Sequence, residues 1–188
     1  MNYPNGIKKN NISKNITFGN RGMTLEKEID ITNEYYRQVD LAHIYKKPTP
    51  ITISKVNYSK SNAIITEAFF KAPSTTDYNG IYKGMYIDFE AKETKIKNYF
   101  PLKNIHSHQI KHIESIIRHN GIAFLIIRFT TQNETFLLLG KDLIEYINNV
   151  KKSSIPYTYF KEKGFIIKDN YTKRVDYLQI IDKIIGGI

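Results

Sequence analysis

The sequence predicts an α/β fold with a mixed β-sheet flanked by helices. Segments with helical periodicity and segments with strand character follow one another in the order helix, several strands, helix, two strands, helix. The run 122-IAFLIIRF-129 is almost entirely apolar, which is typical of a strand covered on both faces. A length of 188 residues suits one domain with a single hydrophobic core.

The first predicted helix begins at Leu25 and ends before residue 41, because apolar residues recur there at helical spacing. Thr24 is expected to cap its N-terminus. Three extended segments rich in β-branched and aromatic residues follow, at 41–45, 51–58 and 63–70. Proline and polar residues separate them, and we interpret the last two segments as a projecting β-ribbon.

The stretch 75-TTDYNGIYKGMYIDFEAKET-94 predicts a hairpin. Turns are expected at Asn79-Gly80 and again near Lys83-Gly84. In the second strand, apolar and charged residues alternate from residue 87 to residue 92, so one face would be apolar and the other charged. The alternation fits either a half-exposed surface strand or a row of catalytic groups.

The remainder of the chain continues the α/β pattern. A helix with an isoleucine stripe is expected over 106–121, where Asn120-Gly121 is a good C-terminal signal. The other expected elements are strands at 122–129 and 134–140, a helix at 141–150, an extended or hairpin-like tail at 156–169, and a closing helix at 174–185.

The composition favours a polyanionic partner. Lys and Arg number 28 against 18 Asp and Glu, which gives a formal net charge of +10 and a pI of about 9.5. Nucleic acid is the leading candidate and an anionic membrane surface is second. No apolar run approaches the roughly 20 residues of a spanning helix, and the N-terminus lacks the apolar region of a secretory signal. We therefore expect a soluble intracellular protein that does not enter a membrane. The absence of cysteine excludes thiolate zinc sites and cysteine nucleophiles.

Asp77, Glu90 and Lys92 form the strongest chemical signal. A hairpin can bring Asp77 back beside Glu90, and two carboxylates at a strand end would supply oxygen ligands for Mg²⁺. The metal would polarise a phosphodiester, while Lys92, on the same strand face as Glu90, would stabilise charge that builds on phosphorus. The alternative is a solvated ion pair, which is common by chance and worth at most about 1 kcal/mol.

Three weaker signals lie nearby. His108 and His112 have the spacing of a zinc pair, but no HExxH pattern or thiolate completes such a site. Asp88 lies on the catalytic face, where it is expected to form a salt bridge with a nearby lysine; the alternative is an acid that supports the catalytic groups. Glu26 fits a position near the site and a surface or capping role equally well.

Four segments carry a resemblance to a known family. In order and at similar separations, 19-GNRGMTLEKEI, 46-KKPTP, 67-EAFFKAPSTTDYNGIYKGMYIDFEAKET and 106-HSHQIKHI resemble the RecU family of Holliday junction resolvases. The resemblance implies a fold like that of type II restriction endonucleases, a homodimer, and Mg²⁺-dependent cleavage of four-way DNA junctions in recombination and repair. It also implies a strand-exchange recombinase and a branch-migration helicase as partners, and a cytoplasmic location at the nucleoid.

The resemblance also assigns residues at the site. It implies metal ligands at Thr75, Asp77, Glu90 and Gln109 and a transition-state-stabilising lysine at Lys92, with Mn²⁺ as an alternative metal. Gln109 comes from the resemblance alone, because its position otherwise reads as a solvated helix residue.

The family's stalk, which enters the junction centre, corresponds to about residues 46–70. The implied DNA contacts are Arg21, Lys46, Lys47, Lys55, Lys60 and Phe70. Sheet core is the alternative for Phe69 and Phe70. Lys60 stands where the family favours arginine, so a point charge replaces a bidentate contact.

The leading interpretation is a homodimeric, Mg²⁺-dependent endonuclease that resolves Holliday junctions by paired nicks. Residues 1–20 would form a disordered basic arm, and residues 21–188 a single nuclease domain that includes the stalk. The alternatives are a restriction-like endonuclease that acts on duplex DNA, and a non-catalytic protein that binds junctions or modulates a recombinase.

Overall fold

The computed structural model describes residues 23–59, 62–71, 75–168, 170 and 172–186. Its elements in chain order are α1 (Leu25–Gln38), β1 (His43–Lys46), β2 (Ile51–Tyr58), β3 (Ala63–Phe70), β4 (Tyr78–Tyr82), β5 (Met85–Thr94), β6 (Tyr99–Pro101), η1 (Leu102–Asn104), α2 (Ser107–Arg118), β7 (Ile122–Phe129), β8 (Glu134–Leu139), α3 (Gly140–Val150), β9 (Ser154–Pro156), α4 (Tyr157–Lys163), β10 (Phe165–Ile167) and α5 (Leu178–Ile185). The expected arm at 1–20, with Arg21 and Lys60, lies outside the described residues. No helix of the described segments is long and apolar enough to span a membrane.

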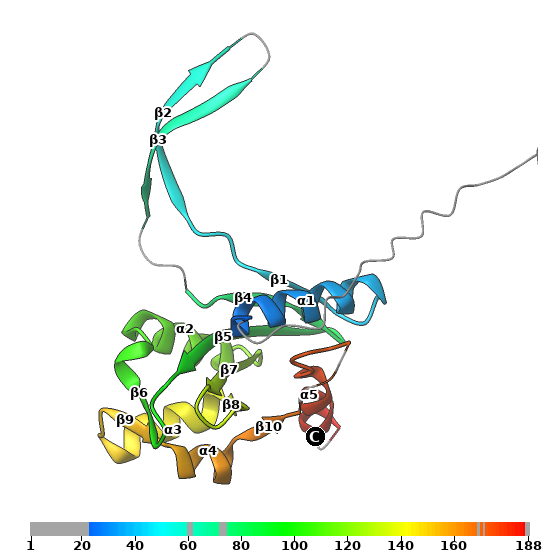
Figure 1. The fold of residues 1–188 in the computed structure, drawn as a ribbon, viewed down its shortest axis with the longest axis vertical. Coiled ribbons are helices and arrows are strands. Elements are labelled where there is room, and N and C mark those ends of the chain that lie inside the picture. The colour runs from blue at the N-terminus through cyan, green and yellow to red at the C-terminus, as the bar shows by residue number, and fades with distance from the viewer. Residues whose placement is uncertain (1–22, 60–61, 72–74, 169, 171, 187–188) are drawn as a thin grey trace, which may run out of the picture.

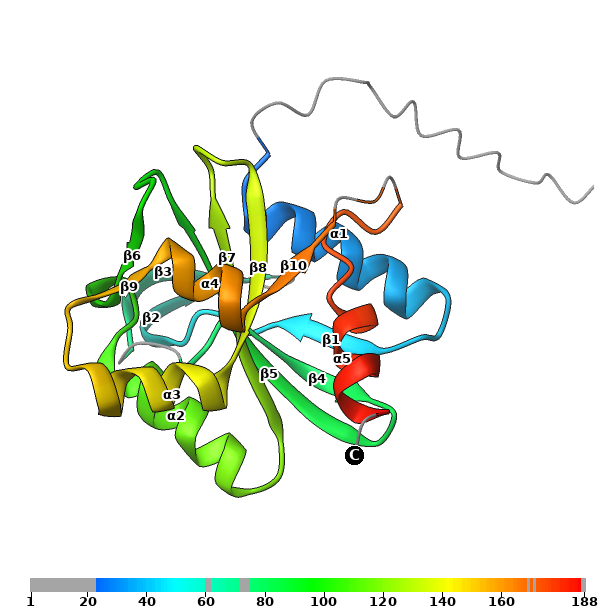
Figure 2. The ribbon, with the colours of Figure 1, turned by 90° about the horizontal axis from the view of Figure 1, so that it is seen from below.

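A six-stranded mixed sheet forms the centre of the fold, in the order β1-β4-β5-β7-β8-β10. β5 and β7 are parallel, and the other neighbouring pairs are antiparallel. Figure 2 shows α1 and α5 on one side of this sheet and α2, α3 and α4 on the other. The predicted α/β class, a mixed sheet flanked by helices, is confirmed.

The two faces of the sheet bury two separate sets of apolar side chains. In β7, Phe124 and Ile126 pack in the core with α1 and α5, while Leu125 and Ile127 pack in the core with α2, α3 and α4. This period of two follows from the pleat of the strand. It explains why 122–129 reads as an uninterrupted apolar run.

Helix α1 begins where the sequence predicts. The Thr24 hydroxyl accepts a hydrogen bond from the Lys27 backbone N–H at 3.4 Å, which satisfies one of the free amides of the first turn. Helix α2 ends at Arg118, and Asn120 adopts a left-handed conformation (φ 61°) before Gly121. The predicted C-terminal signal is therefore confirmed.

Strands β2 and β3 form a separate two-stranded sheet with the predicted bounds. Figure 1 shows it leading away from the six-stranded sheet. No residue of either strand is buried, and the Phe69 and Phe70 side chains are 58% and 84% exposed. The sheet-core alternative for these two aromatic residues is therefore wrong.

The turn expected at Asn79-Gly80 is also wrong, because both residues lie inside β4. A Cβ atom at Gly80 would lie 2.1 Å from the His43 backbone oxygen and 2.6 Å from the Ile44 Cα. Glycine is required here because β1 approaches the β4 backbone closely, not because the chain turns. The turn expected at Lys83-Gly84 is confirmed, with φ of 48° and 77°, as a two-residue hairpin loop needs.

Two further expectations are corrected. The half-exposed surface strand is wrong for β5, whose residues Ile87 to Ala91 are all buried. The tail expected to be extended or hairpin-like instead contains the short helix α4 between β9 and β10. Aromatic residues gave 156–169 its strand character, but Phe160 is buried from a helix, against Phe129 and Phe136.

Candidate active site

The β4–β5 hairpin places Asp77 beside Glu90. Tyr78 pairs with Phe89 in the antiparallel ladder, so the same register carried one residue further sets Asp77 opposite Glu90. The Asp77 carboxylate also accepts a hydrogen bond from the Ala91 backbone N–H at 3.2 Å. The convergence of the two carboxylates that the sequence predicts is present, although a strand follows Asp77 rather than a turn.

A row of stacked rings fixes the face on which these carboxylates lie. Tyr78 stacks on Phe89 with ring centroids 4.8 Å apart, and Phe89 stacks on Phe124 at 4.7 Å. These rings fill the core beneath α1 and α5. Because successive residues of a strand face opposite sides, Asp77 and Glu90 face the side of α2.

The Glu90 carboxyl is fully buried and poorly satisfied. Neither of its oxygens makes a hydrogen bond of ordinary geometry to the described residues, although the Lys92 ammonium is in ion-pair contact with Oε1. Burial, followed by the charge of Asp77, raises the pKa of Glu90 to about 7, against the opposing influence of Lys92 and Gln109. A buried carboxyl with free lone pairs suits a cation that the polypeptide does not itself supply.

Lys92 lies on the same strand face, with a side chain that is 28% exposed. Burial acts to lower its pKa, but contact with Glu90 and the negative charges of Glu90, Asp77 and Glu26 outweigh burial and raise the pKa. The amine is therefore held as an ammonium ion at the margin of the site. A cavity of about 230 Å³ lies beside it, lined by Thr24, Leu25, Glu26, Ala91, Lys92 and Glu93. Glu26 thus lies near the site, where it also pairs with Lys46 at 2.6 Å.

Thr75 and Gln109 complete the predicted ligand set. Thr75 is exposed, and its hydroxyl accepts a hydrogen bond from Lys47 Nζ at 3.0 Å. Gln109 is buried in the first turn of α2, where its Oε1 accepts a hydrogen bond from the His106 backbone N–H at 2.9 Å. The solvated alternative for Gln109 is wrong, because the side chain points inward, where it influences the pKa of Glu90.

The residues present fit a hard divalent cation. All four predicted ligands offer oxygen atoms, and the Glu90 carboxyl, which makes no hydrogen bond of ordinary geometry to the described residues, lies opposite Asp77. Within the described segments no group of three or more His, Asp or Glu side chains could hold a metal by itself. A cation here would therefore depend on the hydroxyl and amide oxygens, on water and on a substrate phosphate, as Mg²⁺ commonly does.

Asp88 differs from Glu90, although both are fully buried on the same strand face. Its carboxylate accepts hydrogen bonds from Lys47 Nζ at 2.7 Å and from the Thr76 and Tyr86 hydroxyls, and His112 Nε2 lies 3.2 Å away. The predicted salt bridge with a nearby lysine is confirmed. Sequence reasoning missed Thr76, whose position next to Asp77 was the only available signal.

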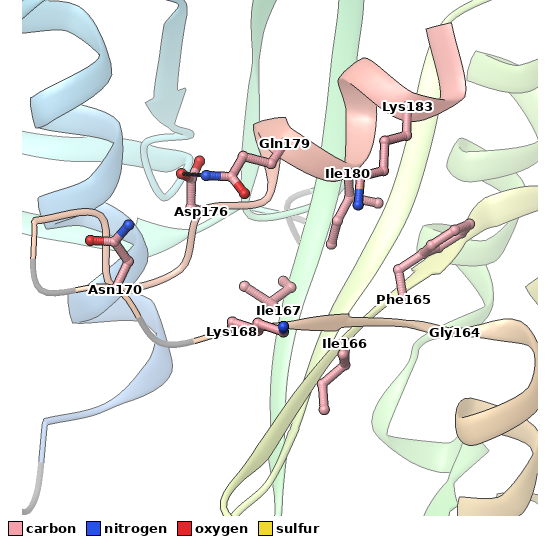
Figure 3. Close-up of a pocket in the computed structure, with 10 residues that line it drawn as sticks. All are labelled: Gly164, Phe165, Ile166, Ile167, Lys168, Asn170, Asp176, Gln179, Ile180 and Lys183. Carbon is pink, nitrogen blue, oxygen red and sulfur yellow. Dashed lines mark hydrogen bonds between the residues drawn. The ribbon is translucent and has the colours of Figure 1, made fainter. Parts of the chain in front are cut away.

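The predicted DNA contacts do not form one cluster. Lys55 and Phe70 lie on the exposed β2–β3 sheet, where Lys55 pairs with Glu67 at 3.5 Å. Lys46 is exposed near α1, whereas the Lys47 side chain is 14% exposed and points into the site. A separate cavity of about 630 Å³ lies between β10 and α5, and Figure 3 shows that its lining contains none of the predicted site residues.

The fold and the site together define a nuclease-like protein. In a mixed sheet flanked by helices, the β4–β5 hairpin brings Asp77 together with Glu90 and Lys92, and two carboxylates and a lysine are groups that phosphodiester hydrolysis uses. The model of the family "Recombination protein U", RecU, matches residues 20–183, so the chain belongs to the RecU family.

Curated relatives agree with this membership. The chain is 53% identical over 194 residues to the Holliday junction resolvase RecU of Oceanobacillus iheyensis, covering 98% of this chain and 99% of the relative. It is 48% identical over 193 residues to the proteins of the same name from Bacillus cytotoxicus and Bacillus thuringiensis strain Al Hakam, covering 97% of this chain and 96% of each relative.

Proposed function

We propose that this chain is a structure-specific endonuclease that resolves Holliday junctions during homologous recombination and DNA repair. The observation that carries the proposal is the fully buried Glu90 carboxyl, which lies opposite Asp77, is paired with Lys92 through Oε1 and makes no hydrogen bond of ordinary geometry to the described residues. Relatives with 48–53% identity over almost the whole chain bear the name of this activity.

Mg²⁺ is the proposed metal, with Mn²⁺ able to take its place. Thr75, Asp77, Glu90 and Gln109 would hold it. When bound, the cation would supply polarisation of the scissile phosphodiester. Lys92 would donate hydrogen bonds to the phosphate oxygens as negative charge builds on them, because it remains an ammonium ion beside Glu90. Glu90 and Asp77 would hold the cation and accept hydrogen bonds from the attacking water, which orients that water relative to Lys92.

The exposed β2–β3 sheet is the proposed stalk that enters the centre of the junction. Lys46, Lys55 and Lys60 would neutralise phosphates, and Phe70, which is 84% exposed, would stack on an unpaired base. Arg21 and the basic arm at 1–20 would add phosphate contacts, while residues 21–188 form the single nuclease domain.

A homodimer fits the proposed substrate. Two-fold symmetry sets two identical sites against two equivalent strands of like polarity, which paired nicking requires. A strand-exchange recombinase and a branch-migration helicase are the proposed protein partners. Because its substrate is chromosomal DNA, the enzyme is expected to act in the cytoplasm at the nucleoid.

The test is cleavage of a synthetic four-way junction and of a matched linear duplex, side by side, with Mg²⁺ or with EDTA. We expect symmetric nicks in the junction with Mg²⁺, no cleavage with EDTA, and little cleavage of the duplex. Equal cleavage of both substrates would indicate a restriction-like duplex endonuclease. Tight junction binding without cleavage in Mg²⁺ or Mn²⁺ would indicate a non-catalytic protein.

The stalk assignment has its own test. Because β2 and β3 pair only with each other among the described strands, residues 51–70 can be replaced by a short Gly-Ser linker without breaking the six-stranded sheet. We expect the shortened chain to fold and to lose much more affinity for the junction than for linear duplex. Equal losses for the two DNAs would remove the stalk assignment.

A further inference from the structure

Lys47 makes contacts that do not suit a DNA-binding residue. It lies between β1 and β2, and its Nζ donates to Thr75 Oγ1 at 3.0 Å, Thr76 Oγ1 at 2.7 Å and Asp88 Oδ2 at 2.7 Å. An ammonium group has three N–H donors. All three are therefore used within the protein, and none remains for a phosphate.

Asp88, which is buried on β5, is the charged partner of this ammonium group. Its Oδ2 also accepts from the Tyr86 hydroxyl at 2.9 Å, and its Oδ1 accepts from the Thr76 hydroxyl. Thr76 thus accepts from Lys47 and donates to Asp88, so the three side chains satisfy one another. The carboxylate is fully buried, which makes its partners costly to remove.

The same lysine is bonded to the segment that carries the proposed metal ligands. Its backbone N–H donates to the Asp77 carbonyl at 2.7 Å, while its side chain reaches the Thr75 and Thr76 hydroxyls. Residues 75–77 lead into β4 and are not yet part of its ladder. Together with the bond from the Ala91 backbone N–H to the Asp77 carboxylate, the bonds of Lys47 and Asp88 therefore fix this segment against β5.

We propose that Lys47 is a positioning residue of the metal site, which acts through Asp88 and Thr76 to hold Thr75 and Asp77 in place, with Asp77 opposite Glu90. The inference rests on the proposed function. The positioning role takes the place of the phosphate contact that was predicted for Lys47 from the lysine-rich segment around it. Its consequence is that the loss of Lys47 weakens metal binding even when DNA is absent.

Calorimetric titration of the full-length protein with Mn²⁺, without DNA, tests this directly. We expect Lys47→Met to weaken Mn²⁺ binding at least about tenfold, as is usual when a group that orients a metal ligand is lost. Lys83→Met is the matched control, because it also removes an ammonium paired with a carboxylate, Asp182 at 2.6 Å, but at the far end of the β4–β5 hairpin. Its Mn²⁺ affinity should match that of the wild type.

Lys47→Arg separates the two roles of the residue. A guanidinium keeps the charge and binds phosphate well, but its planar fork does not match three acceptors arranged around a compact ammonium. A positioning role therefore predicts weak Mn²⁺ binding in Lys47→Arg as well. It also predicts that excess Mn²⁺ restores junction cleavage by both variants, because the chemistry itself is intact.

The opposite result would be wild-type Mn²⁺ affinity in both variants, with junction binding reduced in Lys47→Met alone. That outcome makes Lys47 a phosphate contact and overturns the proposal. If Lys47→Met does not fold, Thr76→Val decides, because it removes only the hydroxyl between Lys47 and Asp88: weakened Mn²⁺ binding supports the proposal and unchanged binding overturns it. If instead the proposed function is wrong, the titrations give another result: the wild-type protein binds no Mn²⁺, or Asp77→Asn binds Mn²⁺ as tightly as the wild type.

Discussion

Two antiparallel hairpins follow one another in this chain and have opposite surroundings. No residue of β2 or β3 is buried, although both strands carry isoleucine side chains, with a tyrosine on β2 and two phenylalanines on β3. In β5, by contrast, the run from Ile87 to Ala91 is buried completely, including two carboxyl groups. Similar strand-forming sequences are thus exposed to solvent in the β2–β3 hairpin and buried between two layers of helices in the β4–β5 hairpin.

The difference indicates where each hairpin contributes. Apolar side chains left exposed on β2 and β3 add little to folding stability and are available to a partner. Carboxyls buried on β5 cost folding stability and are retained where chemistry needs them. Changes in β4–β5 should therefore affect catalysis and folding, whereas changes in β2–β3 should affect what the chain binds.

The largest expected effect is on cleavage. Asp77→Asn or Glu90→Gln should reduce junction cleavage in Mg²⁺ by at least about a thousandfold, because each removes the charge of a proposed metal ligand. Gel-shift measurements should show junction binding largely retained, since neither residue lies on β2 or β3. Unchanged cleavage by either variant would reject the assigned site.

The next effect concerns the close approach of β1 to β4. Gly80→Ala should lower the free energy of unfolding by about 3 kcal/mol or more, because the new Cβ would meet the backbone of His43 and Ile44, which cannot move aside. Denaturant titration measures this. The matched change on the exposed hairpin, Ala68→Val, should stay within about 0.5 kcal/mol of wild type. Similar losses for both would contradict the contrast between the hairpins.

A smaller effect follows from the pKa of Glu90, which burial and Asp77 raise from 4.5 to about 7. The folded state then binds this proton more tightly than the unfolded state, so the group reduces stability as pH rises from about 4.5 to about 7. Without metal, Glu90→Gln should be more stable than wild type at pH 8, by on the order of 1 to 3 kcal/mol.

Below pH 4.5 this difference should vanish, because Glu90 is then protonated in both states. Urea titrations in EDTA at several pH values provide the measurement. A variant that is less stable than wild type at pH 8 would show that the Lys92 contact outweighs the burial of the carboxylate.

The smallest expected effect on folding is at the exposed hairpin. Phe70→Ala should change the free energy of unfolding by less than about 0.5 kcal/mol, since the ring is already 84% exposed. It should nevertheless weaken junction binding by about 1 kcal/mol or more if the ring stacks on a base. A loss of folding stability without a loss of junction binding would contradict the interpretation that β2–β3 contributes to binding rather than to folding.

Local patterns predicted most of the fold. The bounds of β2, β3 and β7 were predicted from β-branched and apolar runs, and α1 from its periodicity and its Thr24 cap. The errors arose where tertiary packing decided the outcome. Gly80 looked like a turn residue because its neighbour on β1 is 37 residues away in the sequence, at His43. Helix α4 was missed because its aromatic residues favour strands in isolation.

At the candidate site too, residues that only tertiary packing brings together could not be predicted from the sequence. Asp77 and Glu90 could be paired in advance because a hairpin joins them, and a strand pattern sets their shared face. Gln109 could not be chosen from its surroundings, because a helix must first pack against the sheet to bring it near Glu90. The inward direction of Lys47 was hidden for the same reason, since its partners lie 28 to 41 residues further along the chain.

The mutual satisfaction of Lys47, Thr76 and Asp88 also limits how this protein can diverge. A substitution at one of these positions leaves a buried charge or hydrogen-bond donor of the other two without its partner. Substitutions are therefore tolerated only in combination. Across family members the three positions should therefore vary together or not at all, whereas exposed positions of β2 and β3 should drift independently.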